Sequence, residues 1–143
     1  MKHTRKPPDD SGCIKHRDGR LRILKVARIA AWSLATAITV LSVVPPDLRP
    51  ETIAPHDLEH FAIYLATGLA FGLGYDRRRG QLAILLVIFS GSVEIAQLFI
   101  PGRHARLSDF IVDALAVCCG VMTVSLVSRI RARTYNYTNP QID

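Results

Sequence analysis

The sequence predicts an all-α membrane protein, a compact bundle of four transmembrane helices with both termini in the cytoplasm. Three observations predict this class. Four apolar runs are each about as long as a bilayer-crossing helix requires. The charged residues gather in the stretches outside these runs, and the lysines and arginines lie overwhelmingly on one side. The 143 residues suffice for one domain, although the apolar fraction of 49% is only slightly high.

The first expected span covers residues 26–44. The chain before it is polar and basic and contains Pro7-Pro8 and Ser11-Gly12, which predicts a disordered cytoplasmic tail over residues 1–25. Ala35-Thr36-Ala37 resembles a signal-peptide cleavage site, but it lies in the middle of the apolar run, and the charged region before it is unusually long. We therefore favour a retained first helix over a cleaved signal peptide.

The second, third and fourth expected spans cover residues 58–75, 82–100 and 110–128. Short polar links separate them, so helices adjacent in sequence are expected to pack antiparallel in a compact bundle. The sequence thus predicts a four-helix transmembrane domain over residues 26–128, followed by a cytoplasmic C-terminal tail at residues 129–143.

The distribution of basic residues orients the bundle. Fifteen lysines and arginines lie in the N-terminal segment up to Arg28, the second link and the C-terminal tail, against three on the other side. Because such residues are enriched in cytoplasmic loops, both termini are expected in the cytoplasm of a multi-pass plasma (inner) membrane protein. The basic stretch at residues 14–25 is expected either to lie on anionic lipid headgroups or to be a solvated tail.

Composition argues against two other kinds of partner. The net charge of +6 could suggest nucleic acid, but no recognition motif and no basic stripe with aromatic residues is present, so nucleic acid is not expected. The three cysteines do not form a disulfide framework, and adjacent Cys118 and Cys119 are interpreted as small packing residues rather than ligands of a soft metal.

Gly68-x-x-x-Gly72 predicts close packing of helices within the chain.

Glu94 is the only ionisable residue of the third run. An acid at the bilayer centre costs about 2.5–3.5 kcal/mol on insertion scales, so chains that keep one usually face it toward a partner, a cavity or a substrate path. With the predicted topology, Glu94 lies about 9 Å below the outer end of its helix. Gln97 follows at i+3 on the same face.

Polar residues of the two neighbouring spans are expected at a similar depth. Asp57, His60 and Tyr64 have i, i+3, i+7 spacing and share one face of the second span. Asp109 and Asp113, at i and i+4, share one face of the fourth span. Three helices are therefore expected to bring polar side chains together on the outer side.

The link before the fourth span supplies Arg103 and Arg106 as expected partners and Ser108 as an expected N-cap. We predict an acidic, partly buried site that opens outward. Its expected binding residues are Asp57, His60, Tyr64, Glu94, Gln97, Arg103, Asp109 and Asp113. Its candidate catalytic residues are Glu94, Asp113 and His60, and no dense motif such as HExxH predicts a metal. A purely structural role, in which the deep acids fix the register of the helices, stays open.

Short motifs in order along the spans carry a family resemblance. They are Pro45-Pro46; Asp57, His60 and Tyr64; Glu94-x-x-Gln97; Pro101-Gly102-Arg103; Ser108-Asp109; and a polar residue at 113 before Gly120. Over residues 38–126 the chain resembles the VanZ-like family, whose namesake is an accessory protein of teicoplanin resistance. It departs at Leu58, where the family often has Lys, and at Asp113, where it usually has Asn. The resemblance implies a small polytopic membrane protein and does not imply that this chain confers resistance.

Three functions remain open. The favoured one is a non-enzymatic VanZ-like protein that modulates the cell envelope or glycopeptide susceptibility, with an envelope lipid or glycopeptide-related ligand as partner. The second is an intramembrane acid–base enzyme that acts on an outer-leaflet lipid or lipid-linked substrate. The third is a small transport or proton-relay protein, although only the outer third of the bundle is expected to be polar. No cofactor is expected.

Overall fold

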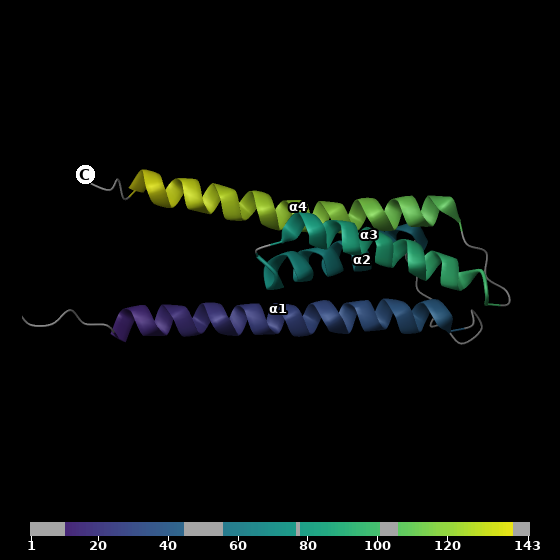
Figure 1. Ribbon diagram of the computed structural model, residues 1–143, viewed down its shortest axis with the longest axis horizontal. Coiled ribbons are helices and arrows are strands. Elements are labelled where there is room, and N and C mark those ends of the chain that lie inside the picture. Colours follow the sequence, from purple (N-terminus) through teal and green to yellow (C-terminus); the bar gives the residue numbers. More distant parts are fainter. Residues whose placement is uncertain (1–10, 45–55, 77, 101–105, 139–143) are drawn as a thin grey trace, which may run out of the picture.

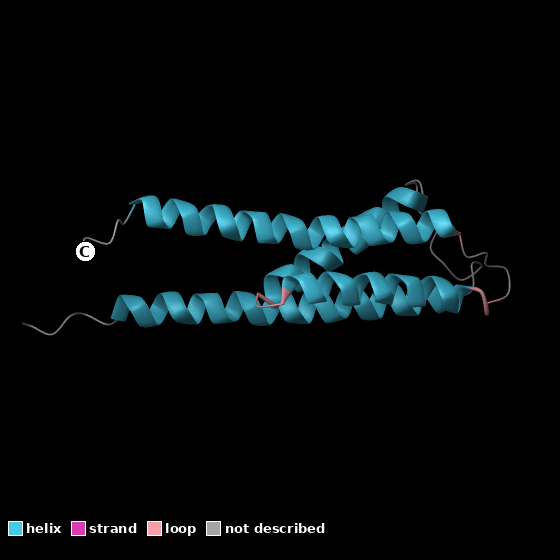
Figure 2. Cartoon of the chain, turned by 45° about the horizontal axis from the view of Figure 1, so that its top comes forward, coloured by secondary structure: helices cyan, strands magenta, loops and turns pink. Residues whose placement is uncertain are grey.

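The computed structural model describes residues 11–44, 56–76, 78–100 and 106–138, and in this part of the chain the ordered elements are four helices (Figure 1). They are α1 (Ser11–Val43), α2 (His56–Gly74), α3 (Arg79–Gln97) and α4 (Leu107–Thr138). Figure 2 shows that the described loops are short and lie at the ends of the helices. The all-α class is confirmed.

Three of the four helices are long and apolar enough to cross a membrane. These segments are Asp18–Val43, Arg79–Gln97 and Leu107–Tyr135, and a shorter apolar helix covers Leu58–Gly74 in α2. The apolar runs of the sequence are therefore confirmed as helices, and three of them have the length that a bilayer requires.

The first and last helices extend well beyond the apolar runs. The prediction of disorder up to residue 25 is wrong for residues 11–25, which are the first turns of α1. Likewise, α4 continues past residue 128 to Thr138. Once a helix exists, each added residue requires only propagation rather than a new nucleus, and Lys, Arg and Leu are good helix formers.

Both extensions point the same way. The start of α1 (purple) and the end of α4 (yellow) project from one end of the bundle, beyond α2 and α3 (Figure 1). We call this end the termini end and the opposite end, where α3 finishes and α4 begins, the far end. The two basic extensions therefore lie at the same end of the bundle, as expected from the charge distribution of the sequence.

α2 is the central helix of the bundle. α2 packs most extensively on α4 and next on α1, and α3 packs mainly on α4. α2 and α3 contact each other only sparsely although a short link joins them. The prediction that helices adjacent in sequence pack together is thus confirmed for α1 with α2 and for α3 with α4. The most extensive contact, between α2 and α4, joins helices that are not adjacent in the chain.

Glycines make the seam between α2 and α4 close. A Cβ added at Gly120 would lie 2.6 Å from the carbonyl oxygen of Leu65, and one added at Gly68 would overlap the carbonyl oxygen of Val117. At Gly72, an added Cβ would lie 3.2 Å from Cβ of Val124. The small-residue pattern of α2 therefore serves packing within the chain, as predicted.

Two arginines hold the end of α2 at the termini end of the bundle. Arg79 Nε donates to the carbonyl oxygen of Gly72 at 3.2 Å, and its Nη2 donates to Ser128 Oγ at 3.0 Å and lies 2.7 Å from Asp76 Oδ1. Arg28 of α1 donates through Nε to the carbonyl oxygen of Gly74 at 2.9 Å. Cations are stabilising at a helix C-terminus, because they interact favourably with the partial negative charge there. Through these contacts α1, α3 and α4 are joined to the end of α2.

Candidate functional site: a polar cluster at the far end

Six polar residues from three helices gather at the far end of the bundle, where α2 and α4 begin and α3 ends. We call them the polar cluster: His60, Tyr64, Glu94, Gln97, Asp109 and Asp113. Each lies within about two turns of the end of its helix, except Tyr64, which lies slightly deeper. The three helix faces that the spacing predicts to converge therefore meet at this end.

The pair of His60 and Asp113 joins α2 to α4. Nδ1 of His60 lies 3.2 Å from Oδ1 and 3.4 Å from Oδ2 of Asp113, a residue that is only 1% exposed. An ionised carboxylate can only accept hydrogen bonds, so with Asp113 ionised His60 carries its proton on Nδ1 and donates. The hydroxyl of Tyr64 also donates to Asp113, and the rings of His60 and Tyr64 stack with centroids 6.3 Å apart.

Glu94 joins α3 to the start of α4. Its Oε1 accepts a hydrogen bond from the backbone N–H of Arg106 at 2.5 Å, and the residue is 7% exposed. Glu94 is also close enough to Asp109, Asp113 and His60 to interact with them electrostatically. It therefore faces the protein interior rather than lipid.

The structure describes some of the remaining predicted site residues fully and others only in part. Gln97 is buried on the same side of α3 as Glu94. Asp109 lies in the first turn of α4, as predicted, where its charge suits the helix dipole. Asp57 lies in the first turn of α2, but its side chain, like the whole of Arg103, is outside the described residues.

The expectation for Ser108 is wrong. α4 begins at Leu107, and the backbone N–H groups of Asp109 and Phe110 donate to the carbonyl oxygen of Arg106. The N-cap position therefore falls on Arg106, ahead of the serine. Ser108 Oγ instead donates to Oδ1 of Asp109 at 3.0 Å.

Comparison with known proteins decides the family. The family model described as VanZ/LLP1 matches residues 23–128, more than half of the chain, and this segment holds every residue of the polar cluster. The chain belongs to the VanZ/LLP1 family. No curated protein and no solved structure matches it. The resemblance seen in the sequence is confirmed, and with the three apolar helices it makes the chain a VanZ-like membrane protein.

The VanZ/LLP1 domain holds a second polar layer that was not predicted from the sequence. Thr67 and Ser90 are buried just beneath the cluster, and each donates its hydroxyl to a carbonyl oxygen of its own helix, at Ile63 and Val87. A signal was present, because Thr67 follows Tyr64 at i+3 and Ser90 precedes Glu94 at i−4. Both hydroxyls are satisfied by backbone, so this layer supports the cluster from below without adding charge.

Beyond this second layer the interior of the VanZ/LLP1 domain becomes apolar. The next buried side chains toward the termini end are those of Phe71, Leu86, Val117 and Val121. A continuous path for protons needs hydrogen-bonding groups through the membrane. The described core instead closes the polar cluster on its inner side.

The charge of the cluster is mostly acidic. Among the residues that the structure describes, neither Glu94 nor Asp113 has a lysine or arginine as an ion-pair partner. The described histidines, cysteines and acids also form no group of three or more placed to hold a metal ion. Acids that share a site favour a proton or a cationic group between them. The arrangement can therefore bind hydrogen-bond donors and cations, and it can exchange protons through His60.

Proposed function

We propose that this VanZ/LLP1 protein is a four-span plasma-membrane protein with both termini in the cytoplasm. One observation and one general rule support this orientation. The basic extensions of α1 and α4 lie at the same end of the bundle, and cytoplasmic segments are enriched in lysine and arginine. The apolar part of α2, Leu58–Gly74, would be the shortest span, packed between α1 and α4. The polar cluster then lies at the level of the outer leaflet.

Through this cluster, we propose, the protein modulates the cell envelope or the susceptibility of the cell to glycopeptide antibiotics. The observation that carries the proposal is the burial of Glu94 and Asp113, from two different helices, in one acidic cluster beside His60. Acids inside a membrane segment are costly and are usually kept for binding or transfer. A polar envelope component, such as a lipid headgroup or a glycopeptide-related group, supplies the donors and cations that this cluster accepts.

Deletion of the gene tests this proposal. We expect deletion to change the sensitivity of the cell to glycopeptides or the composition of its envelope lipids, and the intact gene to restore both. The measurements are antibiotic susceptibility and mass spectrometry of extracted lipids. Unchanged sensitivity together with unchanged lipid composition would contradict the proposed role.

A second candidate function is an intramembrane acid–base enzyme. The observation that favours it is the orientation of His60 by Asp113, because a carboxylate on one imidazole nitrogen fixes the tautomer that a general base needs. Glu94, held by the backbone of Arg106, would be the second proton-transfer group. If the protein is such an enzyme, cells with His60→Gln should accumulate one outer-leaflet lipid, the substrate, and lose the lipid that is its product. A binding role predicts no such substrate–product pair.

A further inference from the structure

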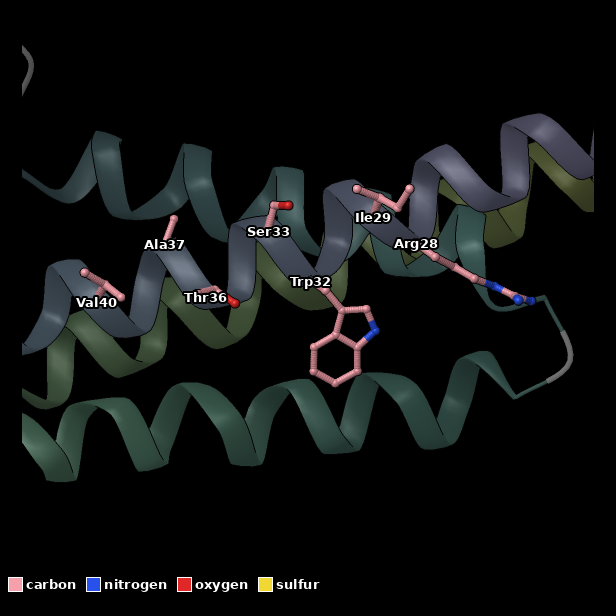
Figure 3. A pocket seen from close by; sticks show the side chains of 7 residues that line it. All are labelled: Arg28, Ile29, Trp32, Ser33, Thr36, Ala37 and Val40. Atoms are coloured by element: carbon pink, nitrogen blue, oxygen red, sulfur yellow. The ribbon is translucent and has the colours of Figure 1, made fainter.

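A shallow, open groove on α1 lies far from the polar cluster. Its volume is about 750 Å³, and all of its lining residues belong to one stretch of α1 (Figure 3). They are Arg28, Ile29, Trp32, Ser33, Thr36, Ala37 and Val40. Ile29 is 67% and Trp32 60% exposed, so this face of α1 is uncovered by the other helices. In Figure 3, Arg28 lies at one end of the groove and Val40 at the other.

The Arg28 end of the groove has the chemistry of a membrane interface. Trp32 Nε1 donates to the hydroxyl of Tyr75 at 3.0 Å, and the guanidinium of Arg28 lies 5.0 Å from the centroid of the Tyr75 ring. Tryptophan and tyrosine collect at the level of lipid headgroups, and arginine reaches the same level. Lys25, which is exposed, precedes Arg28 by almost one turn and adds a second positive charge.

Arg28 differs from the other arginines around it. Arg20 and Arg79 both lie within ion-pair distance of Asp76, at 3.6 Å and 2.7 Å. Arg28 uses only Nε, on the carbonyl oxygen of Gly74. In the described part of the chain its two terminal nitrogens have no acidic partner. A guanidinium with both terminal nitrogens available matches a phosphate, which it can bind with two parallel hydrogen bonds.

The length of the groove matches one leaflet. Arg28 and Val40 are twelve positions apart, which corresponds to about 18 Å along the helix axis. Half of the hydrocarbon core of a bilayer measures about 15 Å. Below Arg28, the lining is apolar or small except for the hydroxyls of Ser33 and Thr36. One acyl chain can therefore lie along the groove while its headgroup stays at Arg28.

We infer that this groove binds one anionic phospholipid from the leaflet at the termini end. Its phosphate contacts the terminal nitrogens of Arg28, its acyl chain follows the face from Ile29 to Val40, and Ser33 meets its ester region. The positive charge of Arg28 and Lys25 selects an anionic over a zwitterionic headgroup. A second copy of the chain is the competing occupant, and the test below separates the two.

The test uses Trp32, which is the only tryptophan in the chain. The full-length protein is reconstituted in phosphatidylcholine nanodiscs that contain a small fraction of phosphatidylglycerol or phosphatidylcholine with brominated acyl chains. Bromine quenches tryptophan fluorescence on contact. We expect brominated phosphatidylglycerol to quench Trp32 at about fivefold lower mole fraction, the preference expected for a basic residue near an anionic lipid. Arg28→Gln is expected to remove most of this preference, since only the charge of Lys25 is left, and Arg28→Lys to keep most of it.

Arg131→Gln is the matched control, since Arg131 is exposed on the α4 extension outside the groove. It is expected to leave the preference unchanged. Equal quenching by the two brominated lipids in the unmodified protein would overturn the inference, whether or not Arg28→Gln folds. An equal loss in Arg131→Gln would also overturn it, because the preference would then reflect surface charge alone. Weak quenching by both lipids, with two copies in each nanodisc, would overturn it in favour of a dimer interface.

Discussion

At the scale of single residues, the buried acids of the far end are stabilised by named partners. Asp113 is 1% exposed and has His60 and Tyr64 around its carboxylate, and Glu94 has the backbone N–H of Arg106. Breaking a buried charged pair by removing one partner costs about 3–5 kcal/mol, because the other group is left without compensation. Each single substitution in the cluster should therefore be costly, and the loss from a paired substitution should be less than the sum of the two single losses.

The pair of His60 and Asp113 allows this to be measured. We expect His60→Ala and Asp113→Ala each to lower the free energy of unfolding by about 3 kcal/mol. The double variant should lose about 1 kcal/mol less than the sum, or still less, since residues in contact show coupling of about 0.5–3 kcal/mol. The measurement is denaturant unfolding in detergent micelles. Strictly additive losses would show that the two side chains do not depend on each other.

Glu94 gives a second prediction at this scale. Glu94→Gln keeps an oxygen that can accept from the N–H of Arg106, whereas Glu94→Leu leaves that donor without its partner. We expect Gln to change the free energy of unfolding by less than about 1 kcal/mol, and Leu to lower it by about 1–3 kcal/mol. Thermal unfolding of both variants checks this. Equal effects of Gln and Leu would mean that the contact with Arg106 contributes little.

Much of the cluster could be predicted from the sequence. An acid inside an apolar run has to face the interior, which placed Glu94, and helical spacing placed His60 and Asp113 on facing sides of α2 and α4. The layer of Thr67 and Ser90 was missed, because hydroxyls that bond their own backbone leave no strong signal in an apolar run. The cap at Ser108 was misplaced, because helix ends vary by one or two residues around any sequence signal.

At the scale of helices, the fold depends on how closely α2 and α4 approach. The glycine pattern of α2 predicted a close contact, but a pattern of small residues on one helix cannot name the helix that it meets. The partner is α4, through Gly120. Helix ends were harder to predict. Hydropathy identifies the part of a helix that lies in the membrane, but it does not indicate the polar turns that continue α1 and α4.

Substitutions of glycine test the seam. Gly120→Ala would place Cβ 2.6 Å from the carbonyl oxygen of Leu65, so the two backbones must move apart. We expect a loss of about 1–3 kcal/mol in the free energy of unfolding. Gly80→Ala is the matched control, because nothing lies within 4 Å of its added Cβ and alanine favours a helix over glycine by about 1 kcal/mol. If Gly120→Ala were as stable as Gly80→Ala, the described seam would be wrong.

At the scale of the whole molecule, charge is separated along the bundle. Basic extensions lie at the termini end, and the acidic cluster lies at the far end. The all-α class and the family could be predicted from the apolar runs and the order of the motifs. The arrangement of the helices could not, since short links leave open which non-adjacent helices share the main seam.

This separation predicts a topology that labelling can measure. In a cysteine-free background, Asp18→Cys on the α1 extension and Leu107→Cys at the start of α4 mark the two ends. We expect a membrane-impermeant maleimide to label Leu107→Cys in intact cells and Asp18→Cys only after permeabilisation, because basic segments stay in the cytoplasm. The reverse labelling pattern would place the polar cluster on the cytoplasmic side and contradict the proposed orientation.

The central claim is that the polar cluster acts on the envelope and does not only hold helices together. The most direct measurement is the glycopeptide susceptibility of a deletion strain that expresses Glu94→Gln, a variant expected to fold. The variant must be as abundant in the membrane as the unmodified protein. Asp18→Asn, an exposed acid on the α1 extension, is the matched control. We predict that Glu94→Gln behaves like the deletion and that Asp18→Asn restores the unmodified phenotype. Full restoration by Glu94→Gln would contradict the claim and leave the cluster a structural role.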